Sequence, residues 1–197
     1  MKKSVVDLSD LQEIAPFFKT KFGIFLGKII IKWLGIKKVN DIHAKHCHLR
    51  GADFTTALLH DPLMDIKYKV HNAELLDTLP EGAFITISNH PFGHIDGIML
   101  IDIFAARRSD FAVMVNGVLT KIGAMEDNFI SVQPDSKNRG ANVANVNGVR
   151  TSLERLKSGH PMGFFPAGAI SFYNKEKKRV MDLDWTLSVI RLIRKGN

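Results

Sequence analysis

Residues 83–97 read AFITISNHPFGHIDG and give the clearest indication of the fold. The first part is a short apolar run of the kind that forms a buried strand. The run ends at Asn89, and the turn-forming residues Pro91 and Gly93 follow. A helical apolar pattern begins at Gly97. A strand that leads through a tight turn into a helix is the first half of a βαβ unit.

The same alternation of strand and helix patterns continues along the rest of the chain. Three further short apolar runs predict strands at residues 111–115, 128–132 and 161–165. Apolar residues at helical spacing predict helices over residues 97–107, 143–157 and 185–195. We therefore expect an α/β fold with a mixed or mostly parallel sheet flanked by helices. In such sheets the functional site lies at the carboxyl ends of the strands.

Two side chains able to carry chemistry stand just beyond the first predicted strand. His90 follows the strand directly, and the turn after it can bring the carboxylate of Asp96 back to the imidazole. A His–Asp pair without a neighbouring nucleophile indicates general-base activation of a hydroxyl or amine. The sequence has no GxSxG motif, and its one cysteine, Cys47, lies far upstream. In the alternative reading, Asp96 only caps the following helix.

The N-terminal part predicts two helices, at residues 8–18 and 21–36, before a mixed, largely helical stretch over residues 40–60. Residues 22–36 read FGIFLGKIIIKWLGI, which as a helix is about 22 Å long and too short to cross a bilayer core. A lysine face beside a broad apolar face with a Trp is typical of a helix in the membrane surface. Alternatively, the apolar face packs on the protein's own core. The predicted membrane contacts are Phe22, Phe25, Lys28, Ile29, Lys32 and Trp33.

Composition excludes several classes of protein. The chain has 197 residues, 45% hydrophobic and 24% charged, which excludes collagen-like, disulfide-scaffold and wholly disordered proteins. Twenty-seven Lys and Arg against 20 Asp and Glu give a net charge of +7, which favours an anionic partner. The basic residues are scattered and not interleaved with many aromatic ones, so we expect no nucleic-acid binding. The cluster around His43 and His46 matches no common zinc spacing, so we expect no metal.

Two segments together resemble a known family. Residues 88–97, SNHPFGHIDG, resemble the first block of the lysophospholipid acyltransferase superfamily, which includes the 1-acylglycerol-3-phosphate acyltransferases. Most members have four residues between the His and the Asp, whereas five separate His90 from Asp96. That spacing is similar to a bacterial branch labelled hemolysin-like, which includes the O-acyltransferases of ornithine and glycine lipids. Residues 164–171, FFPAGAIS, resemble the family's Phe-Pro-Glu-Gly-Thr-Arg-Ser block.

The resemblance implies a fatty acyl transfer from a thioester, on acyl carrier protein or CoA, to a hydroxyl of a lyso-lipid. It implies that His90 is the base and that Asp96 orients it. It also implies that no acyl-enzyme forms and that no cofactor is needed. Backbone N–H groups near Gly168 or Gly93 would hold the oxyanion. A peripheral protein on the cytoplasmic face of the bacterial inner membrane is expected. The implied substrate-binding residues are Asn89, Gly93, Phe165, Pro166, Ala167, Gly168 and Ser171.

The second block departs from the family where an acceptor phosphate would be held. The family's Glu and Arg are replaced by Ala167 and Ile170, and Ile cannot reproduce the fork with which Arg binds phosphate. We therefore expect a lyso-aminolipid acceptor. Two alternatives stay open, a 1-acylglycerol-3-phosphate acyltransferase and a non-catalytic lipid-binding module on a membrane surface. Many members also have an Arg after the third strand, where this chain has Lys137 and Arg139.

The expected organisation has two parts. Residues 1–50 form amphipathic helices that rest on the membrane, and residues 51–197 form the acyltransferase-like α/β domain. A βα unit commonly returns to its sheet, so we expect either that the domain continues beyond Asn197 or that another element covers the last helix. Four basic residues after the second block can meet an anionic head group, a lipid surface or a carrier, or can lie in a solvated loop. They are Lys175, Lys177, Lys178 and Arg179.

Overall fold

The computed structural model describes residues 4–117, 119, 122–132, 143–185 and 187–196. Four parallel strands form one sheet in the order β1-β4-β2-β3. This confirms the predicted α/β class and all four predicted strand positions. The strands are β1 (Ile85–Ile87), β2 (Ala112–Asn116), β3 (Phe129–Val132) and β4 (Met162–Phe164).

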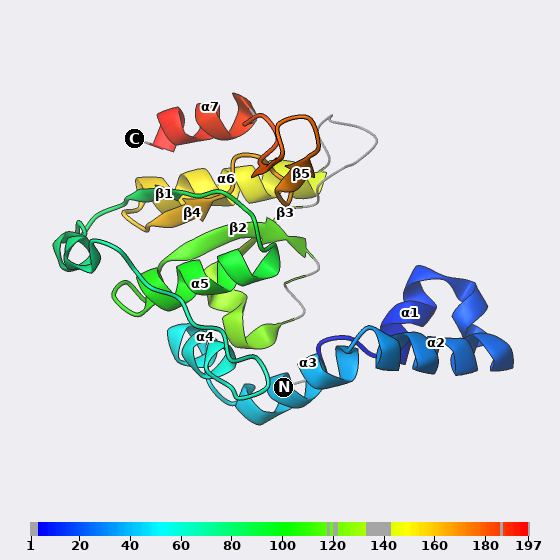
Figure 1. Cartoon of the computed structure of the whole chain (residues 1–197). Helices are drawn as coiled ribbons and strands as arrows, with labels where there is room; N and C mark the ends of the chain where they lie inside the picture. Colours follow the sequence, from blue (N-terminus) through cyan, green and yellow to red (C-terminus); the bar gives the residue numbers. More distant parts are fainter. Residues whose placement is uncertain (1–3, 118, 120–121, 133–142, 186, 197) are drawn as a thin grey trace.

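Helices cover both faces of the sheet (Figure 1). On one face α5 (His94–Ala105) packs on β2, with α4 (Gly51–Leu59) and the 3-10 helix η4 (Gly123–Asn128) beneath it. On the other face α6 (Val143–Lys157) packs on β3 and β4, and α7 (Leu187–Gly196) packs on α6. Each face has its own apolar core. The first contains Ile101, Phe111 and Val113, and the second contains Leu156, Phe164 and Leu192.

The N-terminal helices are shorter than predicted. The helix expected over residues 8–18 is α1 (Leu8–Ile14), which stops before Pro16 because proline has no N–H to donate. A 3-10 helix, η1 (Pro16–Lys19), then leads into α2 (Lys21–Trp33). Gly35 adopts a left-handed conformation (φ 69°), which ends α2 and starts α3 (Ile36–His46). Figure 1 shows α1 and α2 projecting away from the sheet, with α3 as the connection.

Helix α2 buries its glycines and exposes its aromatic residues. A Cβ atom at Gly23 would lie 2.0 Å from the Phe17 carbonyl oxygen, so glycine permits η1 to lie against α2. Gly27 is buried in the same way beneath Leu8. The side chains at helical spacing on the other side are exposed, which leaves this apolar face uncovered by the described residues. They are Phe22, Phe25, Ile29 and Trp33. Within the part of the chain that the structure describes, no helix is long and apolar enough to cross a bilayer.

Two further elements lie outside the sheet. The segment between α4 and β1 contains a 3-10 helix, η2 (Ala73–Thr78). After β4 the chain forms an antiparallel hairpin of β5 (Phe172–Asn174) and β6 (Arg179–Met181), which the sequence patterns did not predict. The predicted final helix begins at Leu187.

A buried carboxylate joins α4 to α5. Asp102 of α5 accepts hydrogen bonds from the hydroxyls of Thr55 (3.2 Å), Thr56 and Tyr68. Burial, together with the adjacent Asp102 carboxylate, raises the pKa of the Tyr68 hydroxyl above its ordinary range, so Tyr68 stays a donor. These bonds hold α5, which begins at the functional site, against the layer below it.

A charged cluster holds the amino ends of the strands together. Asp110 accepts two hydrogen bonds from the Arg108 guanidinium (3.0 and 2.9 Å) and one from His160 Nδ1 (2.8 Å). Arg108 also donates to the carbonyl oxygens of Pro80, Gly82 and Gly159. Burial alone would raise the pKa of the Asp110 carboxyl, but the hydrogen bonds from Arg108 and His160 outweigh it and lower that pKa.

We expect Asp110→Asn to lower the free energy of unfolding by about 1–2 kcal/mol at pH 7, because Arg108 loses its bidentate partner. The lowered carboxyl pKa contributes stability above about pH 4, the unfolded value, and this contribution is lost as the pH falls through the folded value. Urea unfolding at pH 7 and below pH 4 measures both effects. Asp41→Asn, which removes the exposed Lys37–Asp41 pair, is the control and should change stability little. Equal effects of the two substitutions would contradict the assignment.

Candidate active site

The sheet order brings the two sequence blocks together. β1 pairs with β4 in parallel, with Ile87 opposite Phe164. The Ser88 N–H continues this ladder by donating to the Phe164 carbonyl oxygen (3.1 Å). The first block follows β1 and the second follows β4, so both begin at the same carboxyl edge of the sheet.

His90 and Asp96 form the pair that their spacing predicted. His90 Nδ1 lies 3.0 Å from Asp96 Oδ2, and the side chains are 19% and 11% exposed. Because a carboxylate only accepts hydrogen bonds, this contact favours the tautomer with the proton on Nδ1, which leaves Nε2 as the basic atom. The same Asp96 oxygen accepts the Phe92 backbone N–H (2.9 Å), which holds the carboxylate in place. The pair can therefore take up a proton at Nε2.

The reading of Asp96 as an N-cap is wrong. Helix α5 starts at His94 with Gly93 as its N-cap, so Asp96 is the third helical residue and its carboxylate reaches back over the turn. Gly93 has φ 64° and ψ −125°, a conformation that favours glycine, and an added Cβ would lie 2.9 Å from Ile170 Cδ1. The turn that pairs His90 with Asp96 thus depends on glycine at this position.

The second block supports the histidine. The Phe165 ring stacks on the His90 imidazole with centroids 4.1 Å apart, and the Ser171 N–H donates to the His90 carbonyl oxygen (2.9 Å). Pro166 and Ala167, inside this block, are buried, and neither lines the cavity next to His90. Asn89 has an exposed side chain and does not line this cavity.

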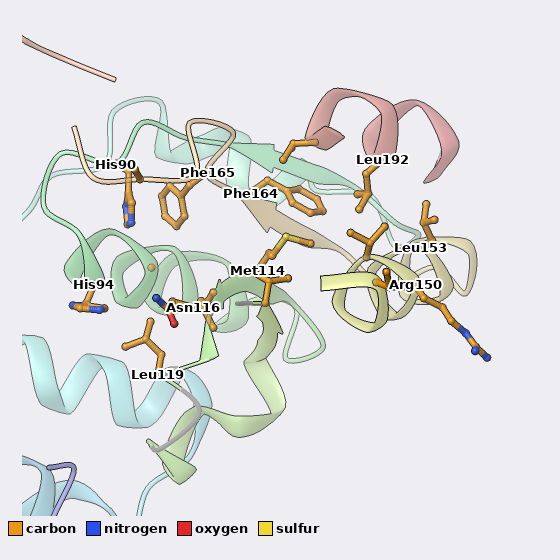
Figure 2. A pocket seen from close by; sticks show the side chains of 18 of the residues that line it. His90, His94, Met114, Asn116, Leu119, Arg150, Leu153, Phe164, Phe165 and Leu192 are labelled. Carbon is orange, nitrogen blue, oxygen red and sulfur yellow. The ribbon is translucent and has the colours of Figure 1, made fainter. Parts of the chain in front are cut away.

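An apolar cavity of about 920 Å³ begins at His90. Gly93, Phe165 and Gly168 line it among the predicted substrate-binding residues, and most of its surface is apolar. Figure 2 shows His90, with His94, Asn116 and Leu119, on one side, Met114 and Phe164 in the middle, and Leu153 and Leu192 on the other side. The cavity passes from the carboxyl edge of the sheet toward α6 and α7. Its volume falls within the range of about 300–1,000 Å³ that is usual for ligand sites.

The backbone N–H of Gly168, a predicted oxyanion donor, already makes a hydrogen bond within the protein. The Gly168 N–H donates to the Phe165 carbonyl oxygen (3.0 Å) within a turn where Gly168 has φ 67°. It therefore does not point a free N–H into the cavity in this structure, which removes Gly168 itself from the predicted donors.

Sequence reasoning missed Asp182. Its Oδ1 accepts the Ser171 hydroxyl and lies 3.5 Å from the His90 backbone nitrogen. Asp182 follows β6, so the hairpin returns the chain to the His90–Asp96 turn. No local pattern relates residue 182 to residue 90, because the contact exists only after β5 and β6 have paired. Asn116, at the carboxyl end of β2, is a polar residue that lines the cavity and that the strand pattern alone could have indicated.

Other predicted positions are not brought into this site. His46 pairs with Asp61 (2.8 Å) in the α3–α4 region, where Lys45 binds the same carboxylate. In the described residues no group of three or more His, Cys, Asp and Glu side chains could hold a metal ion. Lys137 and Arg139 lie outside the described residues.

Comparison with known proteins identifies the family. A family model described as Acyltransferase matches residues 11–194. The chain belongs to this acyltransferase family. No curated protein and no solved structure matches it. The match extends from α1 to α7 of this acyltransferase and so includes the His90–Asp96 turn, the Phe165 block and the cavity. The narrower hemolysin-like branch is not part of this finding.

We expect Asp182→Ala to slow acyl transfer by this enzyme roughly 10-fold to 100-fold. The substitution removes the contacts of Asp182 with the His90 backbone nitrogen and the Ser171 hydroxyl, and a small displacement of His90 would lower the reaction rate. Asp182→Asn keeps an acceptor oxygen for Ser171 and His90, so most activity should remain. Release of the thiol from an acyl thioester measures the rate. The backbone amide resonance of His90 should shift in the alanine variant and little in the asparagine variant. Wild-type turnover by Asp182→Ala would show that this tie has no part in catalysis.

Proposed function

We propose that this acyltransferase transfers a fatty acyl group from a thioester donor to a hydroxyl of a lyso-aminolipid at a membrane surface. The observation that carries the proposal is an imidazole, paired with a carboxylate, at one side of a long apolar cavity. The pair supplies a base for a hydroxyl, and the cavity suits a hydrocarbon chain. The basic net charge agrees with an acidic acyl carrier protein as donor, with acyl-CoA as the other candidate.

The proposed reaction needs no covalent intermediate on the protein. As the acceptor oxygen attacks the thioester carbonyl carbon, His90 Nε2 takes the hydroxyl proton. Asp96 accepts the hydrogen bond from Nδ1–H and stabilises the resulting imidazolium. The first turn of α5 in turn favours the negative charge of the Asp96 carboxylate. The attack forms the ester C–O bond and moves negative charge onto the carbonyl oxygen. The carbonyl then re-forms as the C–S bond breaks, and the leaving thiolate takes the proton from Nε2. Phe165, stacked on the ring, restricts its rotation during both transfers.

The acyl chain is proposed to occupy the cavity between the sheet and α6. Met114 and Phe164 belong to the apolar core on that face of the sheet, and Leu153 and Leu192 continue it beneath α7. Burial of methylene groups there contributes roughly 0.8 kcal/mol each. The thioester carbonyl would lie near His90, and the chain would extend toward Leu192.

We propose that the acceptor has no phosphate group that a cationic side chain of this block must bind. Ile170, at the position of the family's Arg, packs over Gly93 beside the catalytic turn, and Ala167 is buried. Neither side chain offers a charge to a phosphate. A lyso-aminolipid with a free hydroxyl fits this surface better than lysophosphatidic acid does.

Membrane contact is proposed for the exposed face of α2. Phe22, Phe25, Ile29 and Trp33 lie along it, and Lys28 and Lys32 are exposed beside it. Such a face lies within the head-group boundary of an anionic bilayer. A peripheral position on the cytoplasmic face of the bacterial inner membrane is proposed on this basis, with residues 1–50 as the membrane-resting part.

We expect His90→Ala and Asp96→Asn to slow acyl transfer about 10²–10⁴-fold, because one removes the base and the other removes the group that orients it. The assay follows a labelled acyl group from acyl carrier protein to lyso-ornithine lipid, lyso-glycine lipid, lysophosphatidic acid or water. Circular dichroism and vesicle binding should stay as in the wild type.

The lipid panel distinguishes the outcomes. Transfer to an aminolipid that both variants lose supports the proposal. Transfer only to lysophosphatidic acid would contradict the acceptor assignment and leave the chemistry in place. Full transfer by His90→Ala would contradict the general-base mechanism.

We expect Leu153→Phe to shift the donor preference toward shorter acyl chains, because the larger side chain shortens the cavity at its α6 side. The ratio of kcat/KM for long and short acyl donors should fall roughly tenfold. Thr151→Phe places the same ring on the exposed side of α6 and is the matched control. An unchanged chain-length profile in Leu153→Phe would show that the acyl chain lies elsewhere.

A further inference from the structure

The β5–β6 hairpin presents apolar side chains to solvent. Tyr173 and Val180 face each other directly across the two strands, and they are 59% and 60% exposed. Phe172 in the same hairpin is also exposed. An isolated pair of strands is at best marginally stable in water, and exposed apolar pairs mark contact surfaces. The hairpin therefore has the features of an element that meets a partner.

The tip of the hairpin is strongly basic. It contains four cationic side chains and one carboxylate, all of them exposed. Lys178 turns the chain with φ 48°, and the Lys177 N–H closes the turn on Asn174 Oδ1 (2.8 Å). The five tip residues are Lys175, Glu176, Lys177, Lys178 and Arg179. An anionic partner complements this tip.

The hairpin is tied to the catalytic turn at its base. Ser171, just before β5, donates its N–H to the His90 carbonyl oxygen, and Asp182, just after β6, accepts the Ser171 hydroxyl. Phe92, inside the His90–Asp96 turn, is 72% exposed, and Ile170 over Gly93 is exposed as well. A partner surface that contacts the hairpin would therefore also lie next to the His90–Asp96 turn, at the entrance to the cavity.

Apolar side chains beside a cluster of lysines suit one occupant best. At an anionic bilayer, rings and aliphatic groups enter the boundary between head groups and chains while lysines meet the phosphates. Figure 1 shows the hairpin and α2 both on the side of the molecule toward which β2 points. His90 follows β1, which is parallel to β2 and so ends at the same edge of the sheet. We propose that the β5–β6 hairpin is a second lipid-surface contact, which seats the entrance of the catalytic cavity on an anionic membrane. This inference rests on the proposed function for the lipid nature of the acceptor, but its test requires no turnover.

The test places an environment-sensitive fluorophore on the hairpin. In a Cys47→Ser background, Tyr173→Cys is labelled and mixed with vesicles of phosphatidylcholine, with or without phosphatidylglycerol. The label should shift to shorter wavelength and brighten with phosphatidylglycerol vesicles. Ser158→Cys, exposed between α6 and β4 at the opposite edge of the sheet, is the control and should not respond. Circular dichroism checks that each labelled protein is folded.

Charge reversal tests the basic tip. Lys177→Glu with Lys178→Glu should raise the phosphatidylglycerol content needed for half-maximal response at residue 173 roughly tenfold. Lys67→Glu with Lys69→Glu changes the net charge equally on another exposed segment and should have a much smaller effect. Equal effects of the two double variants would overturn the assignment to the tip.

A third label, at Phe25→Cys on α2, separates this inference from the proposed function. A response at residue 25 with none at residue 173 would overturn the inference and leave the proposed membrane contact of α2 intact. A response at residue 173 to acyl carrier protein but not to vesicles would overturn it in favour of a carrier-docking role. A response to anionic vesicles at residue 173 would support it even if no lyso-lipid in the panel were acylated.

Discussion

The site depends on the pairing of β1 with β4. These strands lie far apart in the sequence, yet the parallel ladder sets Ile87 opposite Phe164. Two turns then leave the sheet at one edge, and His90 stacks on Phe165. Without this register His90 would lose both the stacked Phe165 ring and the hydrogen bond from the Ser171 N–H. The apolar cores on both faces hold the register, so the geometry of the candidate site is a consequence of the sheet.

Around that pairing each layer of the fold contributes one part of the proposed acyl-transfer site. Helix α5 supplies Asp96 from its first turn, and the buried Asp102 holds that helix to α4. Helices α6 and α7 close an apolar cavity over the other face of the sheet. The exposed face of α2 and the β5–β6 hairpin lie outside both cores, which is why they remain available for a lipid surface. The proposed chemistry and the proposed hairpin contact therefore lie together at the His90 turn, to which Ser171 connects the hairpin.

Local patterns predicted much of this arrangement. The four strands follow short apolar runs, and the His90–Asp96 pair follows from a turn that Gly93 makes tight. Helix boundaries were less accurate where a single residue decided them, as Pro16 did for α1. The hairpin and Asp182 could not be predicted in the same way, because β5 and β6 are mostly exposed and form no buried apolar run, and because their contacts join distant segments. The cavity likewise arises from the packing of α6 and α7 on the sheet, which no local pattern contains.

The most direct test of the account is the protonation of the His90 ring. Nitrogen-15 NMR of histidine-labelled protein, with His90→Ala for assignment, distinguishes the two neutral tautomers. The account predicts a proton on Nδ1, held by Asp96, and an unprotonated Nε2 facing the acceptor. In Asp96→Asn this preference should weaken or reverse. A proton on Nε2 in the neutral wild-type enzyme would contradict the proposed base, because that atom could not then take a proton from the acceptor hydroxyl.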